Sequence, residues 1–148
     1  MLQTLLERTP AIEQINDSWI PQQQEMCAAV AKSILVIEDD DGIREIVGDV
    51  LNEETIHQVF LAQDGKSGLN MLETAKPDLL LVDYRLPDTT GLELIDRIRR
   101  IKGYEQTPVV LMSASLSREN VTGQYLRYLR KPFDLDILLE MVEDSFEA

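Results

Sequence analysis

The sequence predicts an α/β domain built on a doubly wound, five-stranded parallel sheet, and three observations support this fold class. Short apolar runs alternate with longer amphipathic stretches from Ser33 to the C-terminus. Three of these runs are apolar throughout, as in strands whose two faces are both covered by helices. The same runs end in polar residues, which suits a sheet with a ligand site beyond the carboxyl ends of its strands.

Five segments are expected to form the strands. The second segment alternates between apolar and polar residues, as is typical of a strand near the edge of a sheet, whereas the first, third and fourth are continuous apolar runs. The expected strands are 34–37, 57–62, 79–82, 109–112 and 125–129.

Helices are expected between the strands because apolar residues recur there at helical spacing. After the first strand this spacing runs from Ile43 to Leu51, with Asp40 or Asp41 as the N-terminal cap. Further helices are expected around 69–72, ending before Pro77, from Thr89 or Thr90 to Gly103, and over 135–142.

Residues 1–32 differ in character and are predicted to form a helical extension of the domain made by residues 33–148. Three apolar side chains of this extension share one helical face: Ile12, Ile15 and Trp19. We expect this face to pack on the chain's own domain, with a partner-binding or dimerising arm as the alternative.

Composition and charge exclude several classes of protein. The chain has 148 residues, enough for one domain and a short extension. With 14 basic and 27 acidic residues its net charge is −13, which argues against direct binding of nucleic acid or of an anionic membrane. The single cysteine, Cys27, excludes an internal disulfide and a multi-cysteine zinc site. Without a membrane-spanning run or a secretory signal, the protein is expected to be cytoplasmic.

Polar residues with complementary chemistry follow four of the expected strands: Glu38 and Asp39, Asp83, Ser113 and Lys131. Each would be ordinary alone, as a cap or turn residue, but the carboxyl ends of parallel strands meet at one edge of a sheet. Clustered carboxylates repel one another unless a cation lies among them, and oxygen ligands suit Mg²⁺. A metal ion, a hydroxyl and an ammonium can hold phosphoryl oxygens, and Asp83 can then act as the nucleophile.

The sequence resembles the response regulator receiver domains of two-component signalling, in the CheY-like superfamily. Four segments carry the resemblance: ILVIEDDDGIRE, LLLVDYRLPDTTG, VVLMSAS and YLRKPFD. In the second segment Asp83 is followed four residues later by proline and eight later by glycine, which is the family's phospho-acceptor pattern. The resemblance covers about four-fifths of the chain, from Ser33 onward, and implies a flavodoxin-like fold.

The resemblance also implies roles for individual residues at the strand ends. Asp83 would accept the phosphoryl group. Mg²⁺ would be bound directly by Asp39 and Asp83, mainly through a water molecule by Glu38, and by the backbone carbonyl of Arg85. Lys131 would contact the phosphoryl group.

Two further residues would respond to phosphorylation, by the same resemblance. Ser113 would be the switch hydroxyl, and Tyr128, three residues before Lys131, would be the aromatic switch. The added negative charge would draw Ser113 and Lys131 inward, and the Tyr128 ring would turn into the space that Ser113 leaves.

The implied function is that of a phosphoprotein in a phosphorelay. A histidine kinase or a histidine phosphotransfer protein would donate the phosphoryl group to Asp83, and a downstream protein target or output domain would recognise the altered surface. Such a domain catalyses only its own phosphorylation and slow dephosphorylation, so it is not an enzyme acting on a metabolite.

Two alternatives come from other functional classes. A pseudo-receiver would serve as a phosphorylation-independent protein-interaction module, which the intact Asp39, Asp83, Ser113 and Lys131 argue against. A phosphatase with an aspartate nucleophile would need a second aspartate two residues after Asp83, and that position holds Arg85.

The stretch between Ser113 and Lys131 departs from the family pattern, since it is about one helical turn shorter than usual. Only Leu116 and Val121 are clear apolar anchors in it, too few for a regular helix with a core-facing stripe. We therefore expect a fourth helix that is short, displaced or irregular. The apolar face of the N-terminal extension is expected to cover the surface left bare, within one chain or in a homodimer.

Overall fold

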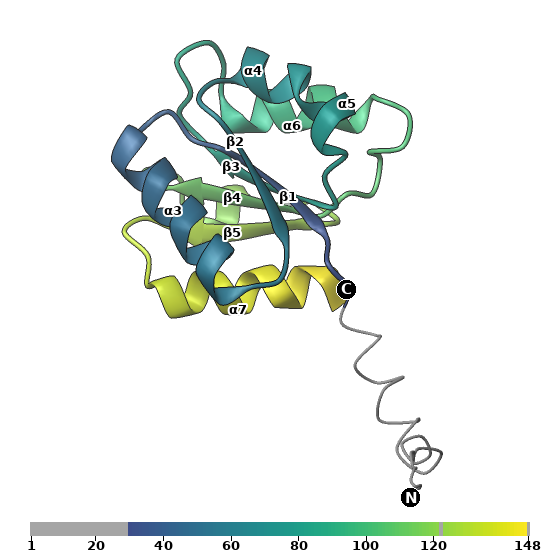
Figure 1. Cartoon of the computed structure of the whole chain (residues 1–148). Coiled ribbons are helices and arrows are strands. Elements are labelled where there is room, and N and C mark those ends of the chain that lie inside the picture. The colour runs from purple at the N-terminus through teal and green to yellow at the C-terminus, as the bar shows by residue number, and fades with distance from the viewer. Residues whose placement is uncertain (1–29, 122, 148) are drawn as a thin grey trace, which may run out of the picture. The chain divides into compact units, whose positions relative to one another are not determined.

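The five expected strands form one parallel sheet with the order β2-β1-β3-β4-β5, as the computed structural model shows (Figure 1). The structure describes residues 30–121 and 123–147. The strand order places β3, which ends in Asp83, at the centre of the sheet. The strands are β1 (Ser33–Ile37), β2 (Gln58–Ala62), β3 (Leu79–Asp83), β4 (Val109–Ser113) and β5 (Leu126–Arg130).

Helices cover both faces of this sheet, which confirms the predicted doubly wound α/β fold (Figure 1). Successive strand residues alternate between the faces, so that Ile34 and Val36 join one buried cluster and Leu35 and Ile37 the other. One face carries α3 (Asp41–Glu54) and α7 (Leu135–Glu147), and the other carries α4 (Gly65–Asn70), α5 (Leu72–Ala75) and α6 (Gly91–Arg99).

Side-chain caps determine where two of the expected helices begin. The carboxylate of Asp40 accepts the Ile43 N–H at 2.9 Å at the start of α3. The hydroxyl of Thr90 accepts the Glu93 N–H at 3.2 Å at the start of α6. Both residues are among the predicted caps, because their short oxygen-bearing side chains can satisfy amides that a helix leaves free.

Two predicted helices differ in extent from those in the structure. The helix expected around 69–72 is divided at Met71 into α4 and α5. The helix expected to close at Gly103 ends at Arg99. It ends early because the hydrogen bonds that follow are of the 3₁₀ type. The Ile101 N–H donates to the carbonyl of Ile98, three residues before it, at 3.0 Å.

The described residues between β4 and β5 contain a single helical element, the short 3₁₀ turn η3 (Arg118–Asn120). This confirms the prediction of a short or irregular fourth helix. The two predicted apolar anchors, Leu116 and Val121, pack against the buried cluster on the α6 side of the sheet. The chain then enters β5 through Tyr125, whose φ of 63° is left-handed.

The predicted N-terminal extension, with its expected face of Ile12, Ile15 and Trp19, lies outside the described residues and stays a prediction. Within the part of the chain that the structure describes, we find no helix that is both long enough and apolar enough to cross a membrane.

Gly91 is required where β3 and α6 meet. A Cβ atom at this position would lie 2.6 Å from the backbone oxygen of Asp83 and 3.0 Å from Tyr84 Cα. Because main-chain atoms cannot give way as the end of a side chain can, Gly91→Ala is expected to lower the free energy of unfolding by about 2 kcal/mol. Urea titration measures this change.

Gly48→Ala is the matched control, in the interior of α3. Its Cβ would meet only the side chain of Leu61, at 3.2 Å, and alanine favours a helix interior over glycine. An equal loss of stability in both variants would contradict the steric explanation.

Candidate functional site

Four charged side chains meet at the carboxyl ends of β1, β3 and β5. The ligand oxygens of Glu38, Asp39 and Asp83 all lie within 4.8 Å of one another. The ammonium of Lys131 donates to Glu38 Oε1 at 2.7 Å and to Asp83 Oδ1 at 3.1 Å. The structure therefore brings together three carboxylates and one ammonium, all of them residues that the sequence predicts for this edge.

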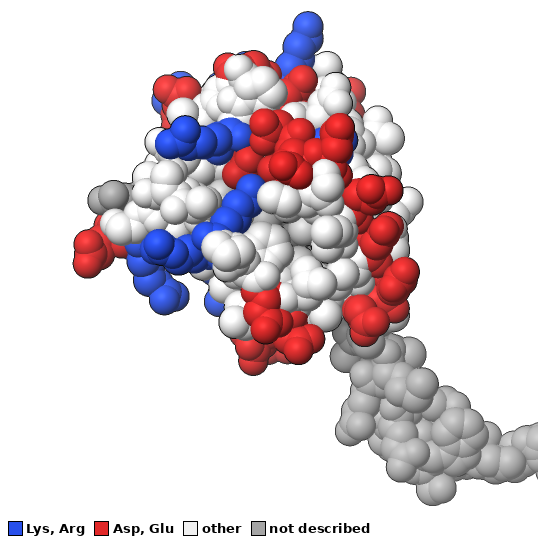
Figure 2. All heavy atoms as spheres, turned by 90° about the vertical axis from the view of Figure 1, so that its left-hand side faces the viewer, with Lys and Arg blue, Asp and Glu red and all other residues white. Residues whose placement is uncertain are grey.

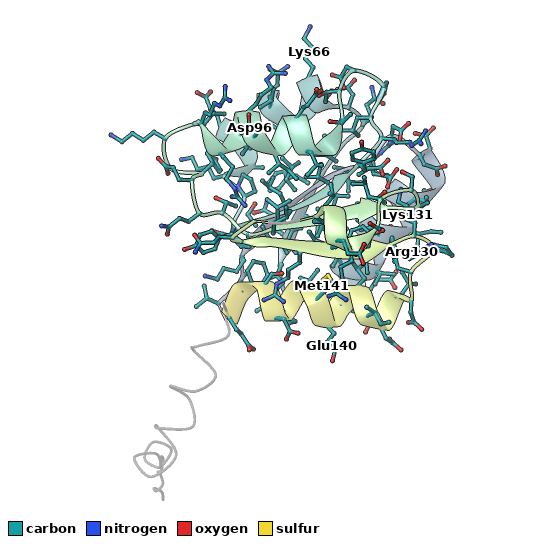
Figure 3. All side chains as sticks on the ribbon, turned by 180° about the vertical axis from the view of Figure 1, so that it is seen from behind. Lys66, Asp96, Arg130, Lys131, Glu140 and Met141 are labelled. Atoms are coloured by element: carbon teal, nitrogen blue, oxygen red, sulfur yellow. The ribbon has the colours of Figure 1, made fainter. Side chains whose placement is uncertain are left out.

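These side chains line an open cleft of about 670 Å³ at the edge of the sheet, and Ser113 and Arg85 line the same cleft. Figure 2 looks onto this edge and shows acidic side chains gathered there with basic side chains beside them. Figure 3 shows Lys131 at the same end of β5 as Arg130. Of the predicted site residues, only Tyr128 is not among the residues that line the cleft.

Burial and the neighbouring charge of Asp83 shift the pKa of two of the carboxylates, Glu38 and Asp39. Burial, with Asp83 beside it, raises the pKa of Glu38 from 4.5 to about 7, although the hydrogen bond from Lys131 opposes this. Burial and the same neighbour also raise the pKa of Asp39. Burial alone would lower the pKa of Lys131, but Glu38 and Asp83 outweigh it and raise that pKa. The ammonium of Lys131 is thus held charged, while Glu38 and Asp39 resist ionisation.

The donor atoms of this cluster fit a divalent metal ion. Three ionised carboxylates and one ammonium would leave a net charge of two negative units in the cleft. The ligands are all oxygen atoms, which hard cations such as Mg²⁺ prefer. A divalent cation would balance the remaining charge and relieve the repulsion from Asp83, which adds to burial in raising the pKa of Glu38 and of Asp39.

Arg44, on the first turns of α3, supports Glu38 in a way that the sequence analysis missed. Its guanidinium donates to the backbone oxygen of Glu38 at 2.8 Å and pairs with Asp41. The Glu38 carboxylate also accepts the Asp40 N–H at 3.2 Å. The sequence offers only the spacing of Arg44, three residues after Asp41 at the start of the helix. Such pairs of opposite charge are common on surface helices and do not by themselves indicate a site.

Ser113 and Tyr128 meet behind the cleft, where the chain leaves β4. The buried hydroxyl of Ser113 accepts the N–H groups of Ser115 and Leu116, both at 3.0 Å. The Tyr128 hydroxyl lies 3.1 Å from the backbone oxygen of Ser113 and 2.5 Å from that of Leu116, and these two acceptors share its one hydrogen. Tyr128 thus ties the turn after β4 to the edge strand β5.

Known proteins resemble this chain in sequence and in fold. The model of the response regulator receiver domain family matches residues 34–143. The chain is 31% identical over 116 residues to sporulation initiation phosphotransferase F of Bacillus subtilis, covering 76% of this chain and 91% of that protein. It is 28% identical over 118 residues to chemotaxis protein CheY of Pseudomonas aeruginosa, covering 77% and 95%. The structure of chemotaxis response regulator CheY4 of Vibrio cholerae is similar with a TM-score of 0.72 at 26% identity, covering 78% of this chain and 99% of that one.

The raised pKa of Glu38 makes the stability of the metal-free domain depend on pH. Because the folded pKa of about 7 exceeds the ordinary 4.5, the folded state binds this proton more tightly than the unfolded state. The resulting stability is fully present below about pH 4.5 and is lost as the pH rises through about 7. In EDTA, wild type is expected to lose on the order of 2 kcal/mol relative to Glu38→Gln between about pH 5 and about pH 8, measured by urea titration.

Mg²⁺ should offset this loss, because the cation and the proton compete for the same carboxylates. The ion is expected to stabilise wild type more at about pH 8 than at about pH 5. Glu53→Gln, on the exposed face of α3, is the control and should follow wild type. If the free energy of unfolding changed with pH in the same way in wild type and in Glu38→Gln, the pH dependence could not be assigned to the Glu38 carboxylate.

Proposed function

The chain belongs to the response regulator receiver domain family of two-component signalling, and we propose that it accepts a phosphoryl group on Asp83 in a Mg²⁺-dependent reaction. The observation that carries this proposal is the contact between Asp83 and Lys131 inside a cluster of three carboxylates. A carboxylate held beside an ammonium and a divalent-metal site is suited to nucleophilic attack on phosphorus.

The proposed donor is a phosphohistidine on a histidine kinase or a histidine phosphotransfer protein. One carboxylate oxygen of Asp83 attacks phosphorus while the P–N bond breaks, and the electron pair of that bond leaves with the imidazole nitrogen. Water later attacks the phosphorus of the acyl phosphate, the P–O bond to Asp83 breaks, and inorganic phosphate departs. The domain therefore catalyses only its own phosphorylation and slow dephosphorylation.

Lys131 can serve both the resting and the phosphorylated state. Its bond to Glu38, at 2.7 Å, keeps the ammonium in the cleft while its second donor passes from Asp83 to a phosphoryl oxygen. Glu38, Asp39, Asp83 and the Arg85 carbonyl would hold the metal ion. Mg²⁺, when bound, supplies positive charge that neutralises the phosphoryl oxygens.

Ser113 and Tyr128 would carry the signal away from the cleft. The Ser113 oxygen accepts two backbone N–H groups, and its own O–H hydrogen, which lies in reach of Ser115 Oγ at 3.4 Å, can turn to donate to a phosphoryl oxygen instead. If the Ser113 hydroxyl turns to the phosphoryl group, it releases the N–H groups of Ser115 and Leu116, and the turn whose backbone oxygens hold the Tyr128 hydroxyl would rearrange next to β5. A downstream protein target, an output domain or a second copy of the chain would recognise the surface beside this strand.

Acetyl phosphate tests the proposed chemistry without a kinase. In the presence of Mg²⁺, wild type is expected to gain the mass of one phosphoryl group, and the adduct should be labile to hydroxylamine because it is an acyl phosphate. Asp83→Asn should form no adduct, since an amide is a poor nucleophile, and EDTA should prevent its formation on wild type. Intact-mass spectrometry detects the adduct on each variant and under each condition.

Asp49→Asn, an exposed position on α3, is the matched control and should be phosphorylated like wild type. A folded wild-type protein that forms no adduct with Mg²⁺ present would favour the pseudo-receiver instead. Release of phosphate from varied small substrates would favour a phosphatase.

A further inference from the structure

We propose that Asp88 is a positioning residue, which anchors the loop between β3 and α6 to the first turn of α4 and so holds the Arg85 carbonyl at the cleft. Asp88 is exposed and is not among the cleft-lining residues. This inference rests on the proposed function, because the position of the Arg85 carbonyl matters only if the cleft binds a divalent cation.

The anchor uses both oxygens of the Asp88 carboxylate. Oδ1 accepts the Gly65 N–H at 2.9 Å, and Oδ2 accepts the Lys66 N–H at 2.9 Å. Figure 3 shows the Lys66 side chain pointing away from the domain, so its contact with Asp88 comes from the main chain alone. The Gly65 N–H, as the main cause, also lowers the pKa of Asp88, which shows that the hydrogen bond favours the ionised carboxylate.

Gly65 allows the loop to lie directly on the backbone of α4. A Cβ atom at this position would be 2.7 Å from Thr89 Cγ2 and 3.2 Å from Asp88 Oδ1. Any larger residue would force the side chains of Thr89 and Asp88 to move, and with them the carboxylate that makes the anchor. The close approach and the two hydrogen bonds thus place the loop tip at one position relative to α4.

The loop between this anchor and Asp83 is cross-linked by its own main chain. Leu86 N–H donates to the Thr89 carbonyl at 3.2 Å, and Gly91 N–H donates to the Tyr84 carbonyl at 2.6 Å. Arg85 itself forms an antiparallel bridge with Thr90. A displacement at Asp88 is therefore passed to Arg85, because the hairpin between them moves as a unit.

Asp88 is more than a cap for α4, because that helix already has a local one. The Asp64 carboxylate accepts the Ser67 N–H at 2.7 Å. Asp64 belongs to the chain leading into the helix, and its carboxylate caps the first turn of that same helix. Loss of Asp64 should weaken the helix alone, whereas loss of Asp88 should free the loop that carries Arg85.

Calorimetric titration of the full chain with Mg²⁺ separates positioning from simple stabilisation. Asp88→Ala is expected to weaken Mg²⁺ binding roughly tenfold, as is usual when support behind a metal ligand is lost. Asp64→Ala is expected to lower the melting temperature while leaving Mg²⁺ affinity within about twofold of wild type. Amide hydrogen exchange without metal should accelerate at Leu86 and Gly91 in Asp88→Ala and not in Asp64→Ala.

Equal Mg²⁺ affinities of wild type and Asp88→Ala would overturn this inference alone. If Asp88→Ala does not fold, Asp88→Asn replaces it, because asparagine keeps one of the two acceptor oxygens. Asp88→Asn should bind Mg²⁺ with an affinity between those of wild type and of a chain without the anchor. Wild-type Mg²⁺ affinity in Asp88→Asn would again overturn the inference. A wild-type chain that binds no Mg²⁺ would overturn the proposed function, and the role of Asp88 with it.

Discussion

The site depends on one interaction, the ammonium of Lys131 shared between Glu38 and Asp83. Three carboxylates within 4.8 Å of one another would otherwise repel in a cleft where Glu38 is fully buried. Sheet topology creates the contact, because β1 and β5 lie on opposite sides of β3 and all three end at the same edge. Lys131 follows the edge strand β5 directly and reaches across to carboxylates at the ends of both other strands.

Much of the fold was predictable because hydrophobic burial determines it. Strands covered on both faces must be apolar throughout, and the polar residues after them must then lie at one edge, which identified Glu38, Asp83 and Ser113. The early end of α6 at Arg99 was not predictable, since it depends on local turn geometry. The contacts of Arg44 and Asp88 were also missed, because hydrogen bonds to main-chain atoms of other segments leave no pattern in the sequence.

The connection between β4 and β5 contains no regular α-helix among its described residues. A 3₁₀ turn is the one helical element among the described residues there, and apolar packing of Leu116 and Val121 holds that turn against the sheet. The Tyr128 hydroxyl bonds to the backbone of the same connection, next to Ser113. In the proposed switch, a change at the cleft therefore reaches the edge strand through one turn and one tyrosine, without a regular helix between them.

The most direct test of this account is a double-mutant cycle between Lys131 and Glu38 without metal, measured by urea titration at about pH 8. Lys131→Met is expected to lower the free energy of unfolding by about 3 kcal/mol, because it leaves buried carboxylates uncompensated. In a Glu38→Gln background, where one of those charges is already absent, the same change should cost at least about 1 kcal/mol less. Equal costs in the two backgrounds would contradict the claim that this ammonium holds the carboxylate cluster together.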